Sequence, residues 1–102
     1  MRMAPTTGLV PDRWVIVKIG TDEPVRRVLA GWLGSYLYGD SWRLSSAVIE
    51  MDAVDDGFQV KTESGSEYFL RKQLHGLTSF TSSVYNQLQG EYPEIEIEET
   101  QL

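Results

Sequence analysis

The segment FQVKTESGSEYFLRK, residues 58–72, decides the fold class, because apolar and polar side chains alternate on both sides of a short polar interruption. This alternation is typical of two β-strands joined in a hairpin. A two-residue loop at Ser64–Gly65 would separate the apolar groups of the two strands onto opposite faces. A three-residue loop at 64–66 instead gathers them on one face, and we predict it because a one-residue slip would expose half of them to water. The predicted inner face contains Phe58, Val60, Thr62, Tyr68 and Leu70.

Three more segments are predicted to be extended. RWVIVKI (13–19) and VRRVLAGW (25–32) are rich in β-branched and aromatic residues and are bounded by turn-forming residues. Residues 42–52 read as extended chain before the pair Asp56–Gly57, which is a strong signal for the turn of a hairpin.

One helix is predicted over residues 78–90, with Ser79 as its N-cap and Gly90 at its C-terminal stop. Its apolar residues repeat at four-residue spacing, at Phe80, Val84 and Leu88. The predicted fold class is therefore mainly β, or α+β by element count. We expect a small, strongly bent antiparallel sheet or a partly open barrel of five to six strands, with one short C-terminal helix.

The 102 residues fit a single domain. We predict a flexible leader over residues 1–12 and a β-rich domain over residues 13–90. In residues 91–102, isoleucines alternate with glutamates, which is strand periodicity with one charged face. This last segment is predicted to be an acidic edge strand or an acidic tail, and the sequence leaves both open.

The formal charge of −6 is unevenly distributed. Residues 1–49 carry six basic and four acidic side chains, whereas residues 50–102 carry three basic and eleven acidic ones. An acidic surface of this kind repels phosphate backbones, so direct binding to nucleic acid is disfavoured. No cysteine is present to act as a thiolate ligand or nucleophile, and no apolar run is long enough to cross a membrane. We expect a cytoplasmic protein that does not bind membranes.

The stretch AGWLGSYLYGDSWRLSS, residues 30–46, concentrates aromatic residues among glycines. Glycines permit a tight bend or a close approach of the backbone, so Gly31, Gly34 and Gly39 are predicted at corners. We predict that Trp32 and Trp42 fill the core beside them. The remaining aromatic and basic side chains are predicted to lie on the surface as a contact for a partner, because such residues dominate protein interfaces. They are Tyr36, Tyr38 and Arg43.

Few residues offer catalytic or metal-binding chemistry. Asp40–Ser41, in the sequence GDS, lacks the histidine and acid that would activate the serine, and we interpret the pair as turn chemistry. His75 is the only histidine and matches no zinc spacing. We therefore predict no catalytic residue, no metal site and no cofactor.

The stretch W-L-G-x-Y-x-x-G-D-S-W-R-L-S-S, residues 32–46, together with SGSEY, resembles small uncharacterised proteins of bacteria and their phages. The resemblance covers about residues 13–70 and implies no activity. It implies an accessory protein of a bacterium or mobile element, a setting in which small acidic inhibitors such as anti-CRISPR proteins are one known class.

These features predict a non-catalytic module that binds another protein through Tyr36, Tyr38 and Arg43 and through an acidic surface formed by Glu94, Glu96 and Glu98. The acidic surface suggests a partner with a basic groove, which the glutamates would fill as mimics of phosphates. One alternative is a small-molecule-binding β domain with a pocket lined by Trp32 and Trp42. A second is a weak hydrolase that uses His75 with Asp40. The sequence does not indicate the oligomeric state.

Overall fold

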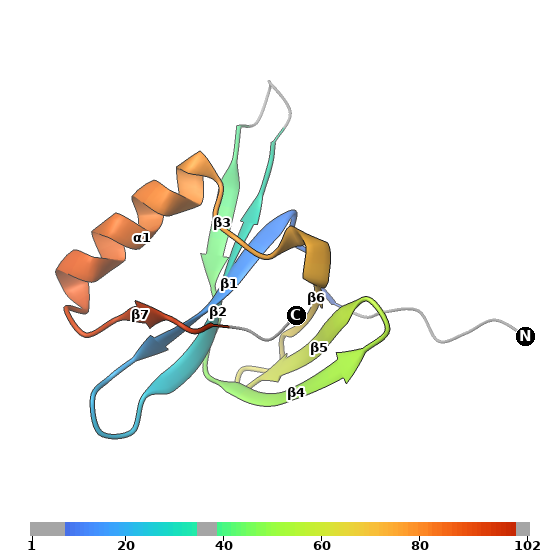
Figure 1. Ribbon diagram of the computed structural model, residues 1–102, viewed down its shortest axis with the longest axis horizontal. Coiled ribbons are helices and arrows are strands. Elements are labelled where there is room, and N and C mark those ends of the chain that lie inside the picture. The colour runs from blue at the N-terminus through green and yellow to red at the C-terminus, as the bar shows by residue number, and fades with distance from the viewer. Residues whose placement is uncertain (1–7, 35–38, 100–102) are drawn as a thin grey trace, which may run out of the picture.

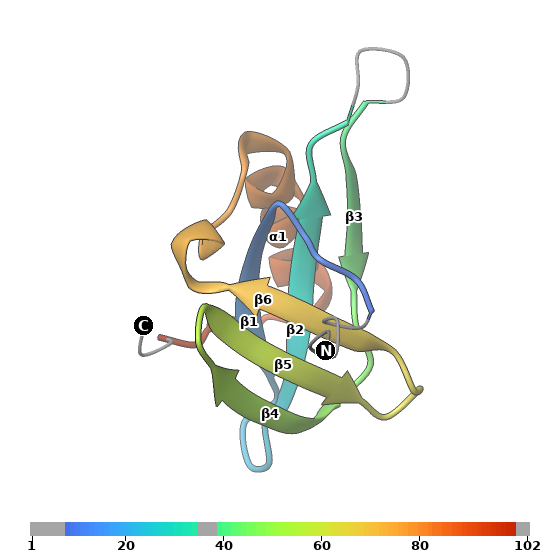
Figure 2. The same cartoon turned by 90° about the vertical axis from the view of Figure 1, so that its right-hand side faces the viewer.

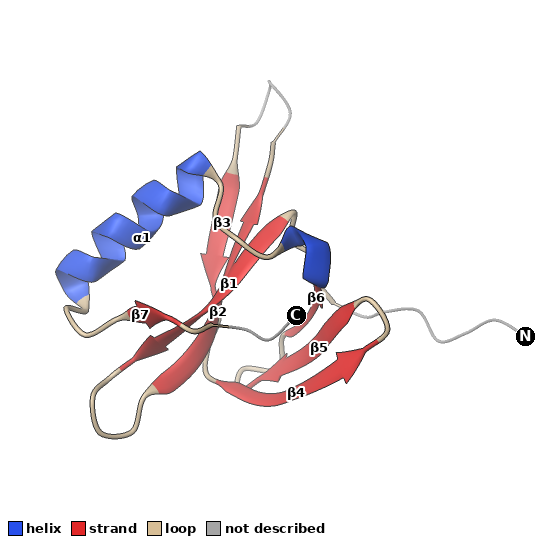
Figure 3. Ribbon diagram, viewed as in Figure 1, coloured by secondary structure: helices blue, strands red, loops and turns tan. Residues whose placement is uncertain are grey.

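The computed structural model describes residues 8–34 and 39–99, which form two antiparallel sheets and one α-helix (Figures 1 and 3). The first sheet has the strand order β3-β2-β1-β7 and the second sheet the order β4-β5-β6. The mainly β fold class is thus confirmed, and the sheets do not close into a barrel. The strands are β1 (Arg13–Ile19), β2 (Val25–Trp32), β3 (Ser41–Leu44), β4 (Val48–Val54), β5 (Gly57–Thr62), β6 (Glu67–Arg71) and β7 (Glu96–Ile97). A 3-10 helix, η1 (Lys72–Leu74), and the helix α1 (Ser79–Glu91) lie between β6 and β7.

The β5–β6 hairpin confirms the predicted inner face. Val60 pairs with Tyr68 and Phe58 with Leu70, so all four side chains point to the same side of the second sheet. The loop has three residues, as predicted, but it comprises residues 63–65, because the Thr62 amide donates to the Ser66 carbonyl at 3.0 Å. Gly65, with φ of +96°, supplies the left-handed residue. The observed and the predicted loop both contain an odd number of residues. The same side chains therefore share the inner face of the hairpin.

The β4–β5 turn differs from the prediction. Val54 pairs with Gly57, so the turn consists of residues 55–56, and Gly57 is the first residue of β5. The φ of Gly57 is not positive. A Cβ atom at this position would lie 1.9 Å from the Leu70 carbonyl oxygen, so glycine is required here for the close approach of β6.

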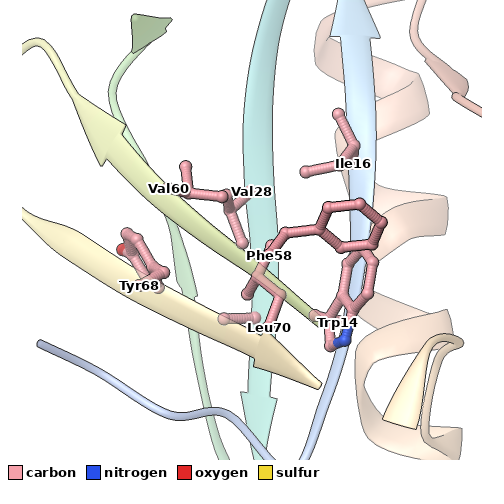
Figure 4. Close-up of a cluster of buried hydrophobic side chains, with 8 residues drawn as sticks. Trp14, Ile16, Val28, Phe58, Val60, Tyr68 and Leu70 are labelled. Atoms are coloured by element: carbon pink, nitrogen blue, oxygen red, sulfur yellow. The ribbon is translucent and has the colours of Figure 1, made fainter. Parts of the chain in front are cut away.

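The main core lies between the two sheets, as Figure 4 shows. The ring of Trp14 packs edge-on against Phe58, with 6.0 Å between ring centroids. Its indole Nε1 donates to the Arg71 carbonyl at 2.7 Å, which ties β1 to the end of β6. The buried residues of this core are Trp14, Ile16, Val28, Ala30, Phe58, Val60, Tyr68 and Leu70.

Helix α1 covers the opposite face of the first sheet (Figure 1). Its buried face consists of Thr81, Val84 and Leu88, so the predicted Phe80 is not part of it and is 36% exposed. A second core forms here from Val15, Val17, Leu29, Val84, Leu88 and Ile95.

The caps of α1 also correct the prediction. Thr78, not Ser79, is the N-cap: its side chain accepts from the Thr81 amide, and the Thr81 hydroxyl accepts from the Thr78 amide, which forms a capping box. Gly90 does not end the helix, which continues to Glu91. The Tyr92 amide donates to the Leu88 carbonyl at 2.7 Å, so the helical hydrogen bonding continues past the glycine.

Residues 8–12 belong to the fold, although the sequence places them in a leader. The Leu9 amide donates to the Glu67 carbonyl and the Phe69 amide donates to the Leu9 carbonyl, both at 2.8 Å. Leu9 thus lies alongside β6 (Figure 2), and Pro11 is fully buried. The pairing is non-local, so no local pattern in the sequence signals it. At the other end of the chain, β7 forms the edge of the first sheet beside β1.

Candidate partner-binding surfaces

The ends of β2 and β3 extend beyond the body of the protein (Figures 1 and 2). We call the described residues of this projection, 31–34 and 39–43, the hairpin arm. Two large apolar side chains are exposed on it: Leu33 at 60% and Trp42 at 42%. Tyr36 and Tyr38, the predicted contact residues, lie outside the described residues. Hydrophobic groups on a projection are candidates for contact with a partner.

Polar contacts fix the backbone of the hairpin arm. The Leu33 amide donates to the Asp12 carboxylate at 2.8 Å, and the Gly34 amide donates to the Asp40 carboxylate at 3.1 Å. Asp40 therefore performs the turn chemistry predicted for it. A Cβ atom at Gly34 would overlap the carbonyl of Gly39, so glycine is needed at this close approach between the two sides of the arm.

Trp32 and Trp42 lie on opposite faces of the first sheet. Trp32 pairs with Ser41 and faces the second sheet, where it packs against the main core and its Nε1 donates to the Val10 carbonyl at 3.1 Å. Trp42 pairs with Gly31 and lies on the face that α1 covers. The prediction that Trp42 fills the core is wrong, because β3 is the edge strand and the ring remains exposed. The two rings do not line a common pocket.

Arg43 is exposed, as predicted, and lies near the buried hydroxyl of Tyr68. Within the described chain no carboxylate is within ion-pair distance of Arg43, and the Tyr68 hydroxyl has no hydrogen bond of good geometry. Burial raises the pKa of the Tyr68 hydroxyl, and the neighbouring Arg43, by hydrogen bonding and by its positive charge, opposes this only in part. Because the hydroxyl is buried and Arg43 is exposed, Arg43 is the member of the pair that a partner can reach. The sequence gives no signal for this pair, since 25 residues separate them.

The three glutamates of the predicted acidic surface have different surroundings. Glu98 forms a bidentate ion pair with Arg26, with both N–O distances at 2.8 Å. Glu96 lies 3.4 Å from Lys18, whereas Glu94 is exposed in the turn before β7. Two of the three carboxylates are therefore neutralised within the protein, which weakens their resemblance to a row of phosphates.

His75 and Asp40 are engaged in separate structural roles. His75 forms a β-bridge with Trp14, and their rings meet edge-on with centroids 4.7 Å apart. Its Nε2 is buried without a hydrogen-bond partner in the described structure, and burial lowers the pKa of the imidazole. Ser41 makes no hydrogen bond to a described histidine or carboxylate. Nor do the described residues contain a group of three or more metal-binding side chains.

The chain matches no protein-family model, and neither a curated protein nor a solved structure is significantly similar to it. Across residues 8–34 and 39–99, no helix has the length and apolar character needed to span a membrane.

Proposed function

We propose that this protein is a non-catalytic interaction module that binds another protein through the hairpin arm. The observation that carries the proposal is the exposure of Trp42 on an edge strand that projects from the body of the molecule. Tryptophan and arginine are the residue types most enriched among those that dominate binding energy. Trp42 and Arg43 are consecutive in β3 and so present their side chains to its two faces.

The fixed backbone of the arm supports this proposal. The hydrogen bonds from the Leu33 and Gly34 amides to the carboxylates of Asp12 and Asp40 hold the backbone of the arm in place before a partner arrives. Preorganisation of this kind reduces the entropy lost on binding. The backbone that carries Leu33 therefore does not have to be ordered on binding.

The acidic surface of Glu94, Glu96 and Glu98 is secondary to the hairpin arm in binding the partner. Glu96 and Glu98 are paired with Lys18 and Arg26, so their charge is largely used to attach β7 to the first sheet. Phosphate mimicry would need carboxylates that a basic groove can reach without breaking such pairs. As a setting, we propose a cytoplasmic accessory protein of a bacterium or phage that inhibits its partner by covering a functional surface.

The experiment is an affinity capture from the source cell with matched surface variants. Trp42→Ala and Leu33→Ala remove exposed groups from the arm, and Ile49→Ala removes a 61% exposed group from β4 as the control. We expect Trp42→Ala to weaken capture of the specific partner about tenfold or more. Ile49→Ala should leave capture unchanged, and all three variants should keep the wild-type melting temperature.

Equal capture by the Trp42→Ala variant and the wild-type protein would refute the proposal. So would a loss of capture that occurs only together with unfolding. A substrate turned over by the purified protein, with turnover lost in His75→Ala and retained in Trp42→Ala, would favour the hydrolase alternative.

A further inference from the structure

The outer edge of β3 lacks the protection found at the edges of β6 and β4. Leu9 covers part of the β6 edge, and β4 carries the exposed carboxylates Glu50 and Asp52 beside a shift in register. Exposed charges and bulges are the usual devices that prevent a sheet edge from pairing with another chain. In the described structure β3 has neither a covering segment nor a bulge, and its one charged side chain is Arg43.

The register of β3 shows which of its backbone groups are free. The Ser45 amide donates to the Val28 carbonyl at 2.9 Å, which makes this a hydrogen-bonded position of the antiparallel pair. Backbone groups alternate in direction along a strand, so those of Arg43 also point toward β2. The amides and carbonyls of Trp42 and Leu44 therefore point away from the sheet and are available to an added strand.

Arg43 indicates the chemistry of that strand. It is an exposed cation without a carboxylate partner in the described chain. An exposed guanidinium group is complementary to a carboxylate. On the other face of β3, the exposed ring of Trp42 is complementary to an apolar side chain.

We propose that β3 binds an extended segment of a partner protein by strand addition, with an acidic side chain on the Arg43 face and an apolar side chain on the Trp42 face. This inference rests on the proposed function and specifies how the hairpin arm is used. Strand addition gives affinity through main-chain hydrogen bonds, and the flanking side chains give specificity.

The probes are two blocked nonapeptides of alternating threonine and valine that differ at one central threonine, replaced by glutamate in one and by lysine in the other. Amide hydrogen exchange of the protein is followed by NMR as each peptide is added. We expect the glutamate peptide to slow exchange at Trp42 and Leu44, while the Arg43 amide, already bonded to β2, changes little. The glutamate peptide should bind about fivefold more tightly than the lysine peptide.

Two variants test the charge preference separately from folding. Arg43→Glu should reverse the preference between the two peptides. Arg43→Lys keeps the positive charge, so the fold and the glutamate preference should both be retained. If neither peptide slows exchange at Trp42 and Leu44, or if Arg43→Glu keeps the wild-type preference, the inference is wrong.

The remaining outcomes separate this inference from the proposed function. If Trp42 and Leu44 exchange slowly in the free protein and this protection disappears on dilution, a second copy of the protein occupies the β3 edge. That result would overturn the inference. If Trp42→Ala loses capture while the wild-type protein in its captured complex shows unchanged exchange at Trp42 and Leu44, strand addition alone is refuted. Unchanged capture in Trp42→Ala would refute the proposed function itself.

Discussion

Gly31 in β2 and Thr81 in α1 approach so closely that no side chain fits between them. A Cβ atom on Gly31 would lie 2.6 Å from the Thr81 Cγ2 methyl group, well inside van der Waals contact. Thr81 is also part of the capping box that begins the helix. The contact therefore sets the position of the helix on the sheet at the base of the hairpin arm.

Gly31→Ala is expected to destabilise the protein by about 1–3 kcal/mol, because the added methyl group overpacks this contact. Thr81→Ser removes the opposing methyl group and keeps the capping hydroxyl. The double variant should recover about 1 kcal/mol relative to the sum of the two single changes. Denaturant unfolding of the four proteins measures this coupling, and strict additivity would show that the contact does not limit the packing.

Alanine should have opposite effects at two other glycines. Gly57→Ala places a methyl group against the Leu70 backbone and should cost at least about 2 kcal/mol of unfolding free energy. Gly90→Ala lies in the helix, is exposed and meets no atom within 4 Å, so it should stabilise by about 0.5–1 kcal/mol. Thermal unfolding of both variants checks the signs, and a stabilised Gly57→Ala would contradict the strand geometry.

The Arg26–Glu98 ion pair should contribute measurably to stability. Glu98→Gln removes the charge of a bidentate, partly buried pair and is expected to cost about 1 kcal/mol. Glu50→Gln is the control, because Glu50 and Lys61 are 3.9 Å apart and each more than half exposed. Its effect on unfolding free energy should be close to zero. Equal effects of the two changes would show that the pair does not hold β7 to the sheet.

His75 should make the protein less stable at mildly acidic pH. Burial lowers the pKa of its imidazole below the ordinary value of 6.5, so as the pH falls the unfolded chain takes up the proton first. Stability from this group is complete above about pH 6.5 and declines as the pH falls toward the lowered folded-state pKa. The wild-type protein should therefore lose more stability than His75→Asn between about pH 7.5 and 5. Parallel pH profiles of the two proteins would contradict this assignment.

The parts of the fold that follow local rules could be predicted from the sequence. The bounds of β1 and β2 follow from their β-branched and aromatic residues between turn-forming residues, and the shared face of β5 and β6 follows from alternation. Each end of α1 lies one residue from its predicted position. The predicted N-cap, Ser79, is wrong: Thr78 and Ser79 are both good N-cap residues, and the capping box with Thr81 decides for Thr78.

The parts that depend on long-range neighbours could not be predicted. The exposure of Trp42 depends on β3 lying at the sheet edge, and its residue type alone favoured the core. Gly57 looked like a turn residue, although the approach of β6 is what requires it. Of the candidate site, Arg43 is indicated by its residue type, whereas the exposure of Leu33 is evident only when the strands are placed in space.

Photo-cross-linking from position 42 tests the central claim most directly, namely that the hairpin arm is the surface that meets a partner. A benzoylphenylalanine side chain is introduced at position 42 or, as the control, at the more exposed position 49 on β4. In extracts of the source cell, we expect a specific cross-linked species from position 42 that excess unlabelled protein competes away. Cross-linking from position 49 alone, or equally from both positions, would contradict the assignment of the hairpin arm as the binding surface.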